Sequence, residues 1–328
     1  MIFQCRNCGG NVIYSPEHKG MYCPYCDSEH SEVRKDSDGS MEICPNCGGE
    51  VPVEEHSSAV QCPYCDNYII LNKRVEGDYA PDLIIPFEHS REMVKKLLWT
   101  RFSRCVFAPV DFLSEARLNS MEGDYVPFWM YDYKARCRYR GEGRRIRCWT
   151  NGEIEYTETS VYDIYREMDI PFEKIPVDAS IKMPDEVMNL MEPYQYEGLR
   201  PFSPEYMSGF MGEKYNMRAN VVEERAKSKM EEDARTLLMQ TVSGYGSVSD
   251  RQKDVQVVDR RISYGLFPVW KYQYRYREKD YPFYINGQTG KVVGKIPIST
   301  GKVWAYGLTL WASLTALMGM AYGILNLL

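Results

Sequence analysis

Eight cysteines in the first 72 residues form four Cys-x-x-Cys turns, and their spacing points directly to metal chemistry. In each half of this segment, 14 residues separate one turn from the next. One such turn presents two thiolates, and a second turn after a short hairpin completes the tetrahedral four-sulfur shell that zinc prefers. The sequence therefore predicts two structural Zn²⁺ ions, with the ligand sets Cys5, Cys8, Cys23, Cys26 and Cys44, Cys47, Cys62, Cys65.

The two sets of cysteines belong to an internal repeat. CRNCGG at residues 5–10 recurs as CPNCGG at 44–49, and CPYCD at 23–27 recurs at 62–66, so that all four cysteines shift by 39 positions. This regularity favours one ion for each copy of the repeat. An interleaved pairing, and iron in the same four-sulfur shell, stay open as alternatives.

A redox role is the competing interpretation of these cysteines, because CPYC is also the glutaredoxin motif. Each CPYC here follows another Cys-x-x-Cys at a fixed distance and precedes no long amphipathic helix, so metal binding is favoured. Cys105, Cys137 and Cys148 lack partners at metal spacing and are expected to be small buried apolar residues.

Charge is distributed unevenly along the chain. Residues 1–72 hold four Lys or Arg against eleven Asp or Glu, a net charge of −7, whereas the remainder holds 36 against 35. Nucleic-acid affinity comes largely from basic residues that neutralise phosphates, so this acidic segment disfavours DNA or RNA as its partner. Residues 1–10 carry no apolar run that would resemble a signal peptide, which favours a reducing cytosolic setting for the cysteines.

The chain divides into four expected parts, and the fold class is α+β. Tandem small β zinc ribbons occupy residues 1–34 and 40–72, joined by a polar linker at 34–40. A mixed α+β middle domain with antiparallel hairpins covers 83–300, and a C-terminal transmembrane helix covers 303–328. We expect the two ribbons to project from the middle domain.

The middle domain mixes helical and strand periodicity. Ser90 is expected to cap a first helix, and a second helix is expected from 222 to 241. Regions 131–159 and 270–293 alternate apolar with polar residues and contain the hairpin dipeptides Asn151-Gly152 and Asn286-Gly287. PFWMYDY at 127–133 also resembles PVWKYQY at 268–274, which raises the hypothesis of two related β-units.

Residues 303–328 contain no charge and would extend about 39 Å as a helix, against a hydrocarbon core of about 30 Å. Aromatic residues lie near its start, and Lys291, Lys295 and Lys302 precede it. This pattern predicts a single-pass, tail-anchored protein of the cell membrane with a cytoplasmic N-terminus; a buried core helix is the alternative. Gly319 and Gly323 suggest self-association of two such helices.

A basic strip is the other candidate contact surface. Its members are Lys134, Arg136, Arg138, Arg140, Arg144, Arg145 and Arg147. On a strand the first four share one face, which could meet anionic lipid head groups or a partner. The favoured alternative is a solvated face paired with Glu153, Glu155 and Glu158 of the next strand.

Catalytic motifs are not evident. The chain has four histidines, and neither a P-loop nor a Gly-x-Ser-x-Gly elbow occurs. We therefore expect a protein that is not an enzyme. Two alternatives stay open: an enzyme with an unrecognised site in the middle domain, and a nucleic-acid-binding regulator that uses the basic strip.

The ribbons resemble the transcription factor IIB-type zinc ribbon, and a wider resemblance covers nearly the whole chain. It is similar to a bacterial family of ribbon-bearing membrane proteins. The motifs that carry this resemblance are YVPFW at 125–129, EPY at 192–194, YMSGF at 206–210, EKY at 213–215, PVW at 268–270 and NGQTGK at 286–291.

Members of that family resemble components of bacterial envelope-stress loci, in which a ribbon-bearing membrane protein helps to recruit a flotillin-like SPFH-domain scaffold and a PspA-type protein. The resemblance implies a docking role at the cytoplasmic face of the membrane, with SPFH-domain or PspA-type proteins as partners. It assigns no docking residues and no catalytic residues. We expect the acidic zinc ribbons to be the part of this membrane-tethered adaptor that docks the partner.

Overall fold

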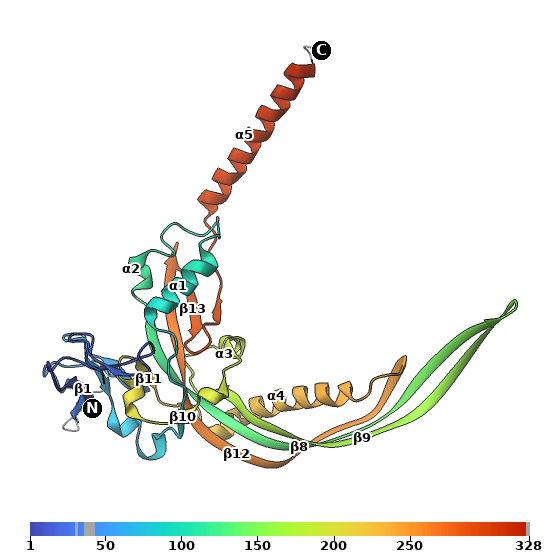
Figure 1. The fold of residues 1–328 in the computed structure, drawn as a ribbon, viewed down its shortest axis with the longest axis horizontal. Coiled ribbons are helices and arrows are strands. Elements are labelled where there is room, and N and C mark those ends of the chain that lie inside the picture. Colours follow the sequence, from blue (N-terminus) through green and yellow to red (C-terminus); the bar gives the residue numbers. More distant parts are fainter. Residues whose placement is uncertain (30–31, 36–42, 326–328) are drawn as a thin grey trace.

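The computed structural model describes residues 1–29, 32–35 and 43–325. Residues 36–40 of the expected linker and 326–328 of the expected tail lie outside the described residues. The molecule has a body from which two long elements leave in different directions (Figure 1). One is a sheet of very long strands, and the other is the C-terminal helix.

The first 72 residues form short antiparallel pairs of strands. Strand β1 pairs antiparallel with β4, β2 with β3, and β5 with β6. The bounds are β1 Ile2–Cys5, β2 Ile13–Ser15, β3 Gly20–Tyr22, β4 Glu32–Lys35, β5 Ser57–Gln61 and β6 Tyr68–Ile70. Two short 3₁₀ helices follow, η1 (Asn72–Arg74) and η2 (Gly77–Tyr79).

The remainder is α+β, as expected. Its strands are β7 Leu83–Ile84, β8 Glu122–Asn151, β9 Ile154–Asp178, β10 Arg200–Pro201, β11 Met211–Glu213, β12 Ser247–Tyr276, β13 Lys279–Asn286 and β14 Val292–Gly294. Its helices are α1 Arg91–Phe102, α2 Glu115–Leu118, α3 Asp185–Met191, η3 Tyr196–Gly198, η4 Pro204–Met207, α4 Ala219–Gln240 and α5 Thr300–Leu325.

A ten-stranded mixed sheet runs through the body in the order β10-β7-β12-β8-β11-β5-β6. Strand β9 pairs with β8, while β13 pairs with β12 and β14. The centre is the antiparallel pair β8 and β12, and each of these strands also receives a short parallel strand from the other half of the chain. Strand β11 lies beside β8, and β7 lies beside β12.

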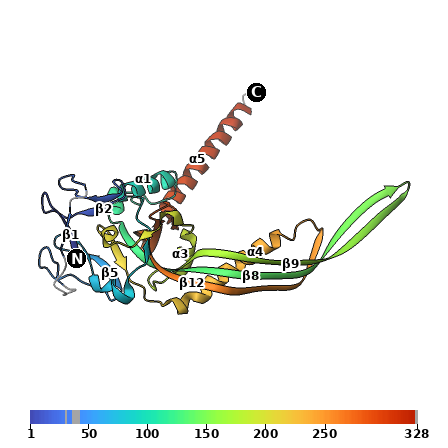
Figure 2. The same ribbon diagram turned by 60° about the horizontal axis from the view of Figure 1, so that its bottom comes forward.

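The long sheet continues beyond the body as an arm, which we define as residues 134–171 of the β8–β9 hairpin with 247–259 of β12 (Figures 1 and 2). The 30 residues of β8 correspond to roughly 100 Å of strand. Helix α4 lies along one face of the arm and buries Val222, Ala226, Met230, Ala234 and Leu238 against it. The opposite face of the arm carries the charged side chains, because successive side chains of a strand point to opposite sides.

Both expected helices are confirmed. The hydroxyl of Ser90 accepts a hydrogen bond from the Met93 amide at 3.3 Å, and α1 buries Val94, Leu98 and Phe102. In α4 the expected apolar positions from Val222 to Leu238 are all buried. Helical spacing predicted both correctly because each helix covers a sheet with a single apolar stripe.

The two Asn-Gly dipeptides predict hairpin turns, and a two-residue turn occurs beside the first dipeptide but not at the second. β8 and β9 turn at Gly152 and Glu153, one residue beyond the expected Asn151-Gly152, and Gly152 has a φ of +65°. Asn286-Gly287 does not form a two-residue turn, because β13 ends at Asn286 and the positive φ of +72° falls on Gly290. The tight turn of this region lies instead between β12 and β13, at Arg277 and Glu278, whose φ angles are +49° and +61°.

Candidate metal centres and a buried polar cluster

The first cysteine cluster is formed by Cys5, Cys8, Cys23 and Cys26, whose Sγ atoms all lie within 4.8 Å of one another. The Cys5–Cys26 and Cys8–Cys23 separations are both 3.6 Å. No disulfide joins these cysteines. Four sulfurs around one metal at about 2.3 Å would be separated by roughly 3.8 Å, so the geometry fits a single tetrahedral ion.

The second cluster repeats this geometry with Cys44, Cys47, Cys62 and Cys65. The Cys44–Cys65 and Cys47–Cys62 distances are 3.6 Å and 3.7 Å. Each copy of the repeat thus closes its own four-sulfur site, and the interleaved pairing does not occur. The structure shows two sites that could bind a metal.

The local turns explain why the sequence repeats around the cysteines. The amides of Gly9 and Gly48 donate to the carbonyls of Cys5 and Cys44 at 2.9 Å, and both glycines have φ near +75°. Asp27 and Asp66, which follow the second turns, both have φ of +57°. Glycine and aspartate tolerate this left-handed backbone better than most residues do, and it aims the flanking sulfurs at one point.

The three remaining cysteines differ from one another. Cys137 is buried beneath α4, as expected. Cys105 is half-buried, and Cys148 is exposed on the arm, so the expectation of burial is wrong for Cys148. The reason is that β8 extends past α4, and nothing in the described structure covers the strand at residue 148.

The first cysteine module is seated on the body. The amide of Tyr14 donates to the carbonyl of Ser208 at 2.8 Å, and the Ser208 hydroxyl donates to the carbonyl of Val12 at 2.6 Å. Gly209 has a φ of +96°, and a Cβ at this position would lie 2.9 Å from Cβ of Ile13. The YMSGF motif therefore forms the seat of this module, which does not project as expected.

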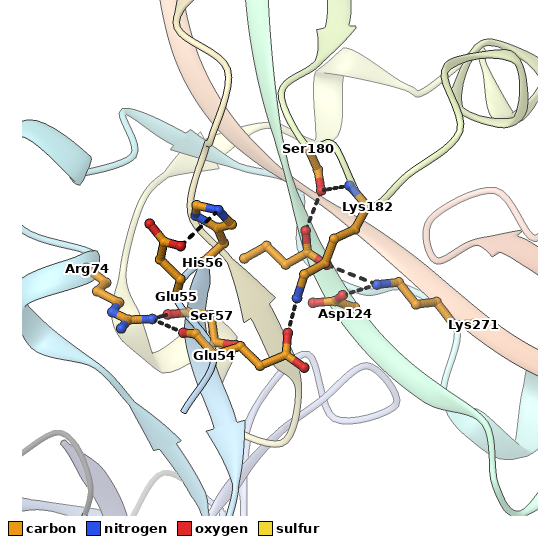
Figure 3. A network of polar contacts seen from close by, with 10 residues as sticks. Glu54, Glu55, His56, Ser57, Arg74, Asp124, Ser180, Lys182 and Lys271 are labelled. Atoms are coloured by element: carbon orange, nitrogen blue, oxygen red, sulfur yellow. Dashed lines mark hydrogen bonds and ion pairs between the residues drawn. The ribbon is translucent and has the colours of Figure 1, made fainter. Parts of the chain in front are cut away.

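The second module is part of the main sheet. Its strand β5 pairs with β11, with Ala59 opposite Gly212. A side chain of this module also contacts the body, since Glu54 of the module forms an ion pair with Lys182. The guanidinium of Arg74 donates to the carbonyls of Glu54 and Ser57 and holds the loop between them (Figure 3).

A buried polar cluster lies beneath this second module (Figure 3). The ammonium of Lys271 on β12 forms ion pairs with Asp124 of β8 and with Glu213 of β11, the latter at 3.2 Å. Asp124 and Glu213 are each only 5% exposed. The Ser180 hydroxyl donates to Glu213 at 2.5 Å and accepts from the Lys182 amide at 3.2 Å.

The electrostatics of this cluster follow from burial. Burial raises the pKa of Asp124 to about 6; Lys271 opposes the rise, and neighbouring Glu213 adds to it. Although burial opposes it, the two carboxylates raise the pKa of Lys271 and keep it charged. The cluster borders a cavity of about 300 Å³ that is also lined by Glu54, Glu122 and Lys182.

Sequence reasoning did not find this cluster. The strand register reveals it by contrast with the matching half of the sheet, where Ile85, Gly265 and Met130 occupy the places of Glu213, Asp124 and Lys271. Met130 and Ile85 lie in an apolar core with α3. The charges therefore occur only where the second cysteine module meets the sheet.

One known protein is similar to this chain over nearly its whole length. The chain is 40% identical over 314 residues to the "Uncharacterized protein YdjG" of Bacillus subtilis (strain 168). The matched region covers 93% of this chain and 92% of that protein. The chain belongs to the YdjG family. No family model and no solved structure matches it.

In this member of the YdjG family the basic strip is divided between two faces of the arm. Lys134, Arg136, Arg138, Arg140 and Arg144 follow one face by alternation, whereas Arg145 and Arg147 follow the other. The Arg145 guanidinium donates to the Gly244 carbonyl at 2.9 Å and lies over the rings of Tyr162 and Tyr245.

The acidic partners of the strip are not the expected ones. Lys134 and Arg136 pair with Asp169, and Arg138 pairs with Glu167. Glu153, Glu155 and Glu158 lie near the turn instead, because the register places Glu158 opposite Arg147 and Glu155 opposite Thr150. Lys134, Arg136 and Arg138 therefore form a solvated row of cross-strand ion pairs, each contributing little to stability.

The C-terminal helix is long and apolar enough to cross a membrane over Thr300–Tyr322, with mean hydropathy 1.2 and no part buried in the body. Trp304 and Trp311 are 74% and 67% exposed. A buried core helix, the alternative considered for this segment, does not occur in the described structure. Gly319 has no neighbouring atom that a Cβ would meet, so a second helix could approach it.

Proposed function

We propose that this protein is a membrane-tethered adaptor that docks partner proteins and is not an enzyme. In this proposal α5 spans the cell membrane as a tail anchor, the body lies on the cytoplasmic side, and each four-cysteine cluster holds one structural Zn²⁺. The partner class that the sequence resemblance implies is an SPFH-domain or PspA-type protein, in the setting of an envelope-stress response.

The observation that carries the proposal is the outer end of the arm. Helix α4 ends at Gln240, and beyond it the β8–β9 hairpin continues with both faces exposed over residues 145–159, which we call the arm tip. Two-stranded hairpins are marginally stable alone in water. An arm tip of this length therefore indicates a surface that another protein covers.

The chemistry of the arm tip supports a protein partner. Trp149 stacks on Tyr156 with ring centroids 5.6 Å apart, and the two residues are 48% and 41% exposed. Ile154 lies on the same face and is 59% exposed. Exposed aromatic side chains are typical anchors of protein interfaces.

The four-cysteine clusters support zinc and a structural role. All eight ligands are cysteine, which leaves no open position of the kind that catalytic zinc requires. A soft four-thiolate shell suits zinc and iron alike, and the zinc assignment rests on the Cys-x-x-Cys spacing in two short hairpin modules. Metal analysis of the purified chain tests it.

The decisive experiment is affinity purification from detergent-solubilised native membranes. We expect wild-type protein to retain a small set of partners, and Trp149→Ser combined with Tyr156→Ser to lose that set while the protein stays in the membrane fraction. Thr150→Ala, on the opposite face of the same hairpin, serves as the matched control. An unchanged partner set in the double variant would contradict docking at the arm tip.

A second variant separates the arm from the metal sites. Cys44→Ser with Cys47→Ser disrupts the second cluster, which lies far from the arm tip (Figure 2). Loss of partners in this variant alone would assign docking to the cysteine modules, whose CPYC tyrosines Tyr25 and Tyr64 are 69% and 70% exposed.

The buried polar cluster favours a second candidate function, an enzyme. Paired carboxylates with one raised pKa, next to a lysine and a serine, occur in many active sites. Here Lys271 forms ion pairs with both carboxylates, and the cavity is at the small end for a ligand site. If the cluster is structural, we expect the Asp124→Asn variant to retain the partners of the wild type. If the wild type has an activity that this variant loses, the enzyme is favoured.

A further inference from the structure

The segment between α1 and α2 is held against the start of the C-terminal helix. The Ser299 amide, just before α5, donates to the carbonyl of Phe107 at 2.8 Å. The Phe107 ring meets the ring of Tyr306 edge-on, with centroids 5.5 Å apart. The segment lies beside the base of α5 (Figure 1).

This contact fixes the depth of the segment relative to the apolar helix. Tyr306 lies inside the stretch Thr300–Tyr322 that is long and apolar enough to cross a membrane. A residue that packs on Tyr306 must share the surroundings of the first turns of that helix. If α5 spans a bilayer, Phe107 reaches the interfacial layer of the leaflet that faces the body.

The composition of the segment matches those surroundings. Val106 and Val110 are 63% and 86% exposed, and Phe107 is 36% exposed. Single exposed aliphatic residues are ordinary, but here three apolar side chains fall within five positions of one loop. The loop is also anchored to a helix whose own Trp304 is exposed.

Charge around the loop favours anionic lipid. Residues 101–110 contain Arg101 and Arg104 and no acidic residue. Lys302 lies in the first turn of α5, so basic groups come from two elements at the same end of the body. Basic residues at a membrane surface attract anionic head groups, and apolar and aromatic side chains settle at the same level.

We propose that residues 103–110 form a membrane-surface loop, in which Val106, Phe107 and Val110 enter the interfacial layer around α5 while Arg101 and Arg104 contact anionic lipid head groups. This inference rests on the proposed membrane tethering by α5. The loop provides a second attachment point, so the body and its arm keep a fixed orientation to the bilayer and do not swivel about residues 294–299.

Lipid photocrosslinking of the full chain tests the loop. The protein is reconstituted into vesicles of phosphatidylcholine, with or without phosphatidylglycerol, that contain a photoactivatable phospholipid, and the crosslinked peptides are mapped by mass spectrometry. We expect crosslinks in α5 and in residues 103–110, with more loop crosslinks when phosphatidylglycerol is present. A peptide containing Tyr25, on a cysteine module, is the internal negative control.

Two double variants sharpen the test. Val106→Asp with Val110→Asp should lower loop crosslinking several-fold while the crosslinks in α5 persist. Arg101→Gln with Arg104→Gln should remove only the increase caused by phosphatidylglycerol. Because all four side chains belong to exposed residues, thermal unfolding should match the wild type in both cases and exclude misfolding.

The outcomes separate this inference from the proposed function. Crosslinks in α5 without crosslinks in residues 103–110 would overturn the membrane-surface loop and leave the tail anchor intact. Loop crosslinking that the aspartate variant does not change would also overturn it. Failure of α5 itself to crosslink would overturn the membrane tethering on which both depend.

Discussion

The indole nitrogens of Trp129 and Trp270 donate to backbone carbonyls in matching places of the fold, each at 2.9 Å. Trp129 on β8 donates to Met217, before α4, and Trp270 on β12 donates to His89, before α1. The backbone repeats this correspondence. The amides of Asn216 and Met217 both donate to Ala179, and those of Glu88 and His89 both donate to Gly287.

These matching contacts relate two β-α-β-β units. One contains β7, α1, β8 and β9, and the other contains β11, α4, β12 and β13. The short first strand of each unit pairs with the long strand of the other unit. Because each unit adds a strand to the sheet of the other, we infer that residues 83–294 fold together.

Substitution of the two tryptophans tests this correspondence. Trp129→Phe and Trp270→Phe each leave one carbonyl without its donor, so we expect the free energy of unfolding to fall by about 1–3 kcal/mol. The loss should be larger for Trp270, which is only 3% exposed. Trp99→Phe, at a residue 60% exposed, is the control and should change stability by less than about 0.5 kcal/mol. Chemical denaturation measures the free energy of unfolding of all three variants. If Trp129→Phe and Trp270→Phe lost no more stability than Trp99→Phe, the two indole hydrogen bonds would not have the structural role assigned to them.

The sequence predicted the local features well and the long-range arrangement poorly. Cysteine spacing gave both four-sulfur clusters, and the Ser90 cap and the apolar stripe of α4 gave two helices, because each signal lies within one short window. Pairing of Met211 with Asp124, or of Leu83 with Gly265, depends on residues far apart in the chain and leaves no periodic trace.

The arm shows a further limit of sequence reasoning. Alternation in 131–159 indicated strand, but it did not reveal that a single strand would run from Glu122 to Asn151 or that α4 would stop short of its end. Cys148 was therefore assigned to a core that does not extend that far. The sequence does not reveal the register of the hairpin, so it predicts Glu153, Glu155 and Glu158 as partners of the basic strip, whereas the structure pairs it with Glu167 and Asp169.

Removal of one cysteine tests the independence of the metal sites. We expect Cys47→Ser to lower the zinc content from two ions per chain to one, because the first cluster shares no ligand with the second. Loss of a structural metal typically costs more than about 4 kcal/mol of stability. Cys148→Ser, at an exposed cysteine outside both clusters, should keep both ions. Elemental analysis and thermal unfolding give the two readouts; loss of both ions in Cys47→Ser would show that the sites depend on each other.

Asp124 predicts a specific dependence of stability on pH. Its pKa is about 6 in the folded protein against an ordinary value of 3.8, so between these values the folded state holds a proton that the unfolded state has released. The contribution of Asp124 is therefore fully present below about pH 4 and declines as the pH rises through 6, by about 3 kcal/mol.

The Asp124→Asn variant isolates this contribution. Wild type should lose stability relative to the variant as the pH rises from 4 to 6.5, measured by denaturant unfolding at each pH. Asp163→Asn, at a carboxylate that is 87% exposed on the arm, should follow the wild-type curve. Parallel curves for wild type and Asp124→Asn would show that the buried carboxylate titrates normally.

The seat of the first cysteine module is tested by substituting two glycines of positive φ. Gly209→Ala imposes a strained backbone and also places the new Cβ 2.9 Å from Cβ of Ile13. Gly77→Ala imposes strain alone, because its new Cβ would meet no neighbouring atom within 4 Å. Strain should lower the stability of both variants by about 1 kcal/mol. Only Gly209→Ala should also push the module off its seat, with faster hydrogen exchange at the Tyr14 amide, which donates to Ser208. Equal exchange at Tyr14 in the two variants would mean that residues 206–210 do not hold the module in place.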